Sequence, residues 1–194
     1  MNREQLARAT TSSDLRWDDA REKDIDTITA LGIIQLRDSR MLRLGRLLIL
    51  LRGYEETKSK TDLRDRMVSD REDAKALLSV LIHTEGTRKD KKMSRAAVFR
   101  TANAAYIEFV FDRCHQCRGA GSIVREEGGN LTCDACNGTG KHRFSDLERS
   151  LNIGCPVEKV PIYGDGLYFA IGLCGTAERL AVSAAADALG RWVK

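Results

Sequence analysis

Two copies of one eight-residue motif, C-x-x-C-x-G-x-G, stand close together in the chain: Cys114-His-Gln-Cys117-Arg-Gly-Ala-Gly121 and Cys133-Asp-Ala-Cys136-Asn-Gly-Thr-Gly140. Fifteen residues separate the inner cysteines. Two C-x-x-C pairs at this spacing supply the four thiolates of a tetrahedral zinc site. The glycines let the backbone take positive φ and turn its N–H groups toward sulfur. The motif therefore predicts one zinc ion, bound by Cys114, Cys117, Cys133 and Cys136.

The predicted metal site is structural, because four cysteine ligands leave no position open for water or substrate. Between the knuckles, residues 122–132 have the pattern of a short β-hairpin with a turn at Gly128-Gly129-Asn130. The resulting finger, residues 113–141, is too small to bury a core and depends on its metal for folding. Two redox-active cysteine pairs, or buried thiols, are the alternative interpretation of the same cysteines.

Composition limits the class of protein only loosely. Lys and Arg number 32 against 28 Asp and Glu, so the net charge of +4 does not by itself establish a nucleic-acid partner. The polar start has no apolar segment typical of a signal peptide, and the aliphatic run 47–51 is too short to cross a bilayer. We expect a cytoplasmic protein without a membrane partner, in which Cys155 and Cys174 are packed thiols.

Hydrophobic periodicity and capping residues predict a mainly α fold, with strands only in the finger. A charged arm is expected at residues 1–23, then an apolar stripe over 25–52 that ends at Gly53. The capping box Ser69-Asp-Arg-Glu72 predicts a helix start, with the helix running to about His83 and Gly86 beyond its end. Ser94 is expected to cap a helix that reaches Asp112.

After the finger, Ser145 is expected to cap a short helix, Asp146–Ile153, that buries Leu147 and Leu151. Residues 154–166 read as irregular, followed by a last helical region from Leu167 with a cap at Thr176. The chain then divides into an N-terminal helical extension, 1–60, and a helical DNA-binding domain, 61–194, with the finger inserted. In this domain the finger joins helices 94–112 and 145–153 in a helix-turn-helix-like arrangement.

Basic residues flank the finger on both sides. One run, residues 87–100, includes Lys89, Lys91 and Lys92, and the other is Lys141-His142-Arg143. With Arg118, Ser145 and Arg149, these are the candidate DNA contacts, because lysine suits phosphate and arginine suits guanine edges in the major groove. Solvated surface runs beside an ordinary capped helix are the alternative interpretation.

The order of a helix, two C-x-x-C-x-G-x-G knuckles around a hairpin, a short basic helix and a helical C-terminal region resembles the Q antitermination proteins of lambdoid bacteriophages, in their zinc-containing lambda-type branch. The resemblance covers residues 69–188 and is specific at the cysteines and glycines of the knuckles, whereas residues 1–60 have no match. It implies a factor that binds DNA at a phage late promoter in the bacterial host. It also implies that the factor joins RNA polymerase through the sigma factor and the β-subunit flap, so that polymerase reads through terminators.

A second interpretation is a zinc-stabilised protein-interaction module without sequence-specific DNA binding. The same knuckle is the repeat of the cysteine-rich region of DnaJ co-chaperones, although this chain has two copies and no His-Pro-Asp signature. An enzyme is not expected, because the sequence has no Ser/His/Asp set, phosphate-binding glycine loop or H-E-x-x-H motif.

Overall fold

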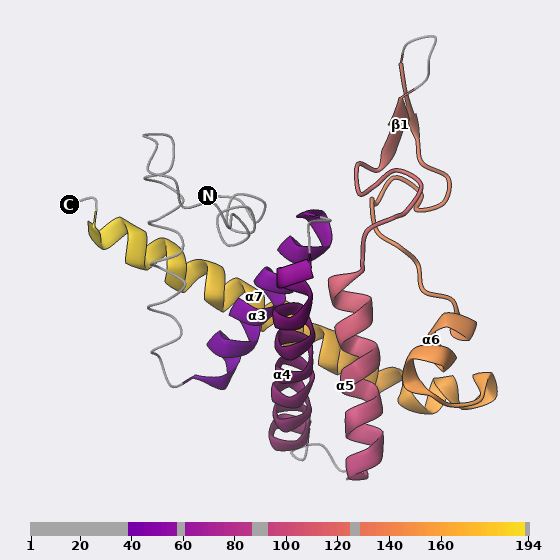
Figure 1. The fold of residues 1–194 in the computed structure, drawn as a ribbon. Coiled ribbons are helices and arrows are strands. Elements are labelled where there is room, and N and C mark those ends of the chain that lie inside the picture. Colours follow the sequence, from indigo (N-terminus) through magenta and orange to yellow (C-terminus); the bar gives the residue numbers. More distant parts are fainter. Residues whose placement is uncertain (1–38, 58–60, 87–92, 125–128, 193–194) are drawn as a thin grey trace.

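The computed structural model describes residues 39–57, 61–86, 93–124 and 129–192, and these residues are mainly helical (Figure 1). Their elements are α3 (Arg40–Thr57), α4 (Thr61–Gly86), α5 (Arg95–Val110), β1 (Ser122–Val124), β2 (Asn130–Thr132), α6 (Asp146–Ile153), the 3-10 helix η2 (Val157–Lys159) and α7 (Val160–Trp192). The mainly α fold predicted from the sequence is confirmed. The predicted arm at 1–23 and most of the stripe before α3 lie outside the described residues.

One hydrophobic core joins α3, α4, α5 and α7. Leu44, Leu48 and Leu51 of α3 are fully buried against Leu78 of α4 and Leu167 of α7. α4 and α5 stand side by side, and α7 runs across them (Figure 1). The core is therefore continuous across residue 60, the expected domain boundary, and α3 belongs to it as fully as α7 does.

The crossing of α3 and α7 is close enough to require glycine. A Cβ on Gly45 would stand 2.0 Å from the Ala177 carbonyl oxygen and 2.8 Å from Cβ of Ala181. Both alanines are fully buried. Small residues on both helices thus bring the two backbones into direct contact, and this contact fixes where the helices cross.

Two sequence expectations about helix bounds near the N-terminus are wrong. α3 does not end at Gly53 but continues to Thr57, and α4 begins at Thr61 rather than at Ser69. Ser69 lies inside α4, where Glu72 forms an ion pair with Lys75 along the helix. A capping box predicts the start of a helix only where the preceding residues are not helical. Here the residues before Ser69 already belong to α4.

Residues 154–166, expected to be irregular, instead contain η2 and the beginning of α7. Pro161 is compatible with α7 because it lies in the first turn, where a missing N–H leaves no hydrogen bond unmade. Thr176 is not a cap. It lies inside the same helix, and its hydroxyl donates to the Gly172 carbonyl at 3.0 Å.

α7 belongs to a stretch, Val157–Ala188, that is long and apolar enough to cross a membrane by length and composition. Helices in the core of a folded domain can have the same length and apolar composition, and one side of α7 is buried in this way. It buries Leu167, Ala170 and Cys174, and it carries the buried carboxylate of Glu178. That carboxylate pairs with Arg52 of α3 at 3.5 Å.

We expect Gly45→Ala to destabilise the protein by about 1–3 kcal/mol, because the added methyl group overpacks the α3–α7 crossing. Gly172→Ala is the matched control, since Gly172 also lies in a helix but has open space where its Cβ would be. That variant is expected to be neutral or slightly more stable. Urea unfolding of both variants measures the difference, and equal stabilities would contradict the close crossing.

Candidate metal centre and the helix beside it

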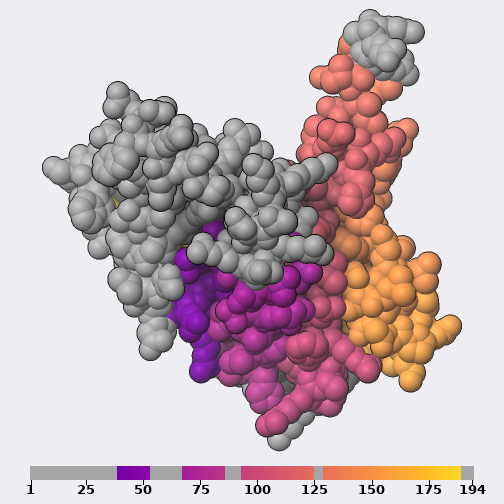
Figure 2. All heavy atoms as spheres, in the orientation of Figure 1, coloured from indigo at the N-terminus to yellow at the C-terminus, as the bar shows by residue number. Residues whose placement is uncertain are grey.

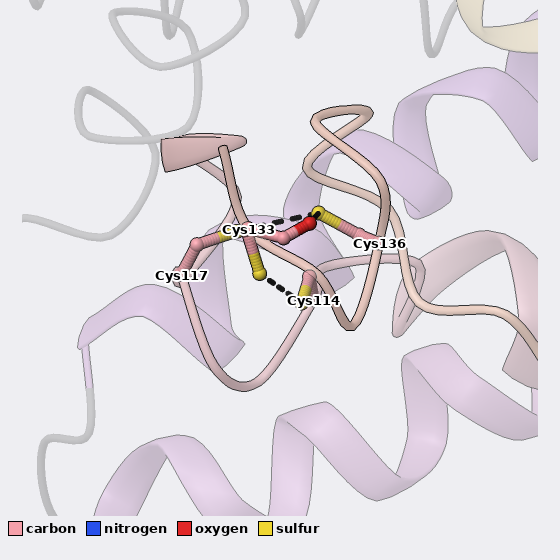
Figure 3. Close-up of side chains that lie close together, drawn as sticks. All are labelled: Cys114, Cys117, Cys133 and Cys136. Carbon is pink, nitrogen blue, oxygen red and sulfur yellow. Dashed lines mark hydrogen bonds between the residues drawn. The ribbon is translucent and has the colours of Figure 1, made fainter. Parts of the chain in front are cut away.

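The four knuckle cysteines come together in one buried cluster, with their Sγ atoms all within 4.8 Å of one another (Figure 3). Sγ of Cys114 is 3.8 Å from Sγ of Cys133, and Sγ of Cys117 is 3.7 Å from Sγ of Cys136. These distances are too long for disulfides, whose sulfurs are bonded at about 2.05 Å. A tetrahedron of thiolates with metal–sulfur bonds of about 2.3 Å has edges of about 3.8 Å, so the cluster has the size of a zinc site.

The two knuckles have the same backbone conformation. In the first, φ is positive at Arg118, Gly119 and Gly121, and in the second at the equivalent Asn137, Gly138 and Gly140. The amide of Gly121 donates to Sγ of Cys117, and the amide of Gly140 donates to Sγ of Cys136, both at 3.2 Å. These bonds stabilise thiolate charge, which is the role that the sequence predicts for the glycines.

The last glycine of each motif also contacts the other knuckle. A Cβ on Gly121 would lie 2.4 Å from the Gly138 carbonyl oxygen, and a Cβ on Gly140 would lie 2.3 Å from the Gly119 carbonyl oxygen. Any larger residue would therefore push the knuckles, and with them the sulfur pairs, apart. The glycines determine the size of the cluster as well as the local turn.

The thiols of one knuckle differ in their tendency to ionise. Burial raises the pKa of Cys133 to about 11. Burial also opposes ionisation of Cys136, but the Gly140 amide and the neighbouring thiols outweigh it and lower the pKa of Cys136 to about 7. A bound divalent cation compensates the charge of four thiolates and favours their ionisation together. The donor set therefore fits Zn²⁺, which prefers sulfur ligands and has no demand for a fifth position.

A short stem connects the metal cluster to the helices. Arg113 and Lys141 face each other in an antiparallel bridge. The His142 amide donates to the Asp112 carbonyl at 2.7 Å, and the Cys114 amide donates to the Gly140 carbonyl at 2.8 Å. Beyond the cluster, β1 and β2 form the antiparallel hairpin that the sequence predicts, with Ile123 opposite Leu131. The finger projects from the helical body as a narrow column (Figure 2).

The stem leads directly into α6, whose start is confirmed at Ser145. The Ser145 hydroxyl accepts from the Glu148 amide, and the Glu148 carboxylate accepts from the Ser145 amide at 2.7 Å. The other oxygen of that carboxylate lies 2.9 Å from Nε2 of His142. Hydrogen bonds from the Ser145 backbone and side chain, followed by the one with His142, lower the pKa of Glu148 to about 2. His142 thus connects the stem to the capping box.

Arg149 holds α6 against α5. Its Nε and one terminal nitrogen contact the two carboxylate oxygens of Glu108 at 3.0 and 3.1 Å. The side chains are only 20% and 5% exposed, respectively. The guanidinium also lies over the Tyr168 ring of α7, 5.5 Å from its centroid. The sequence predicts Arg149 as an exposed candidate for base contacts, whereas in the structure its side chain is largely buried and bound to Glu108.

The buried face of α6 is also different from the expected one. Leu147 and Leu151, expected to be buried, are 61% and 73% exposed, whereas Ser150 and Ile153 are buried. Asn103 of α5 donates to the Asn152 carbonyl at 2.8 Å, on the same side as the Arg149 ion pair. Polar anchors therefore set the rotation of this short helix, and its two leucines face outward.

The remaining candidate DNA contacts divide into three groups. Arg118, Lys141, Arg143 and Ser145 are exposed around the knuckles and the stem, while His142 is partly buried. Lys89, Lys91 and Lys92 lie outside the described residues. Sequence reasoning missed Arg113, which is exposed opposite Lys141, and its position directly before Cys114 was the available signal. It also missed Glu108, a carboxylate on the apolar helix that enters the finger.

Comparison of the chain with protein-family models, with curated proteins and with solved structures gives no match. The fold shows a helical body with a buried four-cysteine cluster suited to a structural metal. The stem and the ion pair of Arg149 hold this cluster between α5 and α6.

We expect one equivalent of zinc per chain, and loss of both zinc and hairpin order in Cys136→Ser. Cys155→Ser is the matched control, because Cys155 is a free cysteine outside the cluster and should leave the metal content unchanged. Metal quantitation together with thiol titration tests this. Zinc release should accompany the appearance of four reactive thiols, and full zinc content in Cys136→Ser would contradict the ligand assignment.

We expect Arg149→Met to destabilise the protein by about 3 kcal/mol, because it leaves the Glu108 carboxylate buried without this partner. The double variant Arg149→Met/Glu108→Gln should recover part of that loss, since the uncompensated charge is removed. Urea unfolding of the two single variants and the double variant measures the coupling. Additive losses would show that the pair does not hold α6.

Proposed function

We propose that this protein is a zinc-stabilised DNA-binding factor of the Q antitermination type. It binds duplex DNA at a phage late promoter and joins host RNA polymerase, so that polymerase reads through terminators into late genes. The contacts with the sigma factor and the β-subunit flap are part of the proposal through the family resemblance. The zinc ion is structural, and it sets the geometry of the stem that approaches DNA.

The observation that carries the proposal is the clustering of exposed cations at the foot of the finger. Arg113 and Lys141 are opposite each other across the stem bridge, a position that places side chains on the same face. A Cβ on Gly119 would lie 3.7 Å from Cγ of Arg113, so Arg113 lies beside the backbone next to Arg118. Arg143 follows two residues after Lys141 and is also exposed.

Such a cluster on a rigid stem suits the negatively charged backbone of DNA. Neutralising phosphates releases counterions, so affinity falls steeply with salt. In this arrangement Lys141, Arg143, Arg113 and Arg118 contact phosphates, and Ser145 caps α6. Arg149 acts as an anchor of α6 rather than as a reader of bases, because its guanidinium is bound to Glu108.

A protein-interaction module is the second candidate, and the exposed leucines of α6 favour it. Leu147 and Leu151 are four residues apart, so they lie on one side of the helix. Apolar side chains on an exposed helix face are typical of protein contacts rather than of phosphate contacts. In an antitermination factor both surfaces have a use, one for DNA and the other for a protein partner.

Electrophoretic mobility shifts of the full chain on late-promoter DNA and on mixed-sequence duplex test the DNA proposal. Lys141→Ala and Arg143→Ala should each weaken binding and reduce the slope of log affinity against log salt by about 0.9, the effect of one lost phosphate contact. Lys159→Ala is the control, because Lys159 is an exposed lysine in η2, outside the stem. A wild-type protein that binds neither duplex would overturn the proposal.

Terminator read-through in a reconstituted transcription reaction separates the two candidates. Antitermination predicts that the stem variants lose read-through in proportion to DNA affinity. A protein-interaction module predicts that Leu147→Ser/Leu151→Ser abolishes its partner contacts while Lys141→Ala and Arg143→Ala change nothing. Promoter binding without any read-through would reject the antitermination role and leave the DNA-binding role in place.

A further inference from the structure

Arg52, near the C-terminal end of α3, is a largely buried cation that contacts three parts of the fold. One terminal nitrogen donates to the Phe109 carbonyl in the last turn of α5, and the guanidinium lies 4.2 Å from the centroid of the Phe109 ring. The other terminal nitrogen pairs with Glu178 of α7 at 3.5 Å. The Arg52 side chain is 13% exposed, so these interactions are made with little solvent screening.

The guanidinium also reaches the residue from which the finger stem begins. The terminal nitrogen that donates to the Phe109 carbonyl also lies 3.1 Å from Oδ2 of Asp112. The same oxygen is 3.7 Å from Nζ of Lys141, on the opposite strand of the stem. Two cations therefore share one carboxylate oxygen, and the buried guanidinium is the closer of the two.

This sharing matters because Lys141 is one of the cations proposed to contact DNA. The Lys141 side chain is 72% exposed, and an exposed ion pair of this length contributes little. The guanidinium of Arg52, which also pairs with Glu178, already compensates part of the charge of the Asp112 carboxylate from the interior. Without it, Asp112 would present an uncompensated charge beneath the stem, attract Lys141 more strongly and repel phosphate.

We propose that Arg52 is a positioning residue for nucleic-acid binding: it neutralises Asp112 from inside the fold and so leaves Lys141 available for a phosphate. This inference rests on the proposed binding of DNA by the stem. Arg52 does not touch the nucleic acid. It acts through Asp112, and its contact with Phe109 holds the end of α5 from which the stem starts.

The test is the salt dependence of binding to a fluorescent mixed-sequence duplex. Arg52→Met should weaken binding and lower the slope of log affinity against log salt by about 0.9, as if Lys141 had been removed. Adding Lys141→Met to Arg52→Met should then have little further effect, although Lys141→Met alone lowers the slope in the wild-type background. The double variant Arg52→Met/Asp112→Asn should restore the wild-type slope. Lys159→Met, which changes an exposed lysine of η2, should leave the slope unchanged.

A purely structural role for Arg52 predicts different results. In that case the effects of Arg52→Met and Lys141→Met on the slope would add, and Asp112→Asn would not restore binding. Either result overturns the inference. If Arg52→Met does not fold, the salt dependence of duplex binding by Arg52→Lys and by Asp112→Asn tests the inference instead. The lysine keeps a cation beside Asp112 and should preserve the slope, and Asp112→Asn should tighten binding at unchanged zinc content.

A DNA-independent measurement separates failure of this inference from failure of the proposed function. The rate at which an amine-acylating reagent modifies Lys141, followed by mass spectrometry, reports how strongly Asp112 holds its ammonium group. We expect slower modification in Arg52→Met and recovery of the rate in Arg52→Met/Asp112→Asn. If the wild-type protein binds no duplex, the proposed function fails. An unchanged acylation rate in Arg52→Met overturns the role of Arg52 by itself.

Discussion

Four sulfur atoms held within a few ångströms of one another are the constraint on which the finger depends. The finger has only a short hairpin beyond the cluster, and apart from the cysteines Ile123 is the one partly buried apolar residue packed there among the residues that the structure describes. In the proposed zinc-bound form, a metal ion that draws the thiolates together replaces the missing core. The stem between Asp112 and His142 then takes its spacing from the cluster, and α5 and α6 diverge from that stem.

Ion pairs hold the base of the finger in place on the helical body. Glu108 and Arg149 hold α6 on α5, and Arg52 connects the end of α5 to α3 and α7. All three ion pairs are largely buried, so the loss of one partner leaves a charge without its compensation. The stem is consequently attached to the helical body by directional polar contacts, which specify one orientation more strictly than apolar packing does.

Local chemistry explains which features the sequence could predict. The four-cysteine cluster, the glycine turns, the hairpin and the caps at Ser94 and Ser145 depend on residues close together in the chain, and all of these agree with the structure. The packing of α3 on α7 depends on Gly45 meeting Ala177, more than a hundred residues away. Sequence periodicity contains no information about such a contact.

The sequence predictions that the structure contradicts failed where residues distant in the chain, or the surrounding helix, decide the local structure. Ser69 and Glu72 have the right types for a cap, but the helix had already begun at Thr61. Pro161 and the glycines after it suggested irregular chain, although proline in a first turn is compatible with a helix. On α6 the two leucines were assigned to the core, yet Glu108 and Asn103 bind the opposite side of the helix. Long-range polar partners therefore overrode the apolar pattern.

The reciprocal glycine contacts give the two knuckles an approximate twofold relation. Gly121 meets Gly138, and Gly140 meets Gly119, so each knuckle presents the same surface to the other. The same close approach is therefore made twice, once from each knuckle. The segment joining them acts as a tether that raises the effective concentration of one half near the other. A substitution at Gly121 or Gly140 would act on both knuckles at once, because each of these contacts crosses from one knuckle to the other.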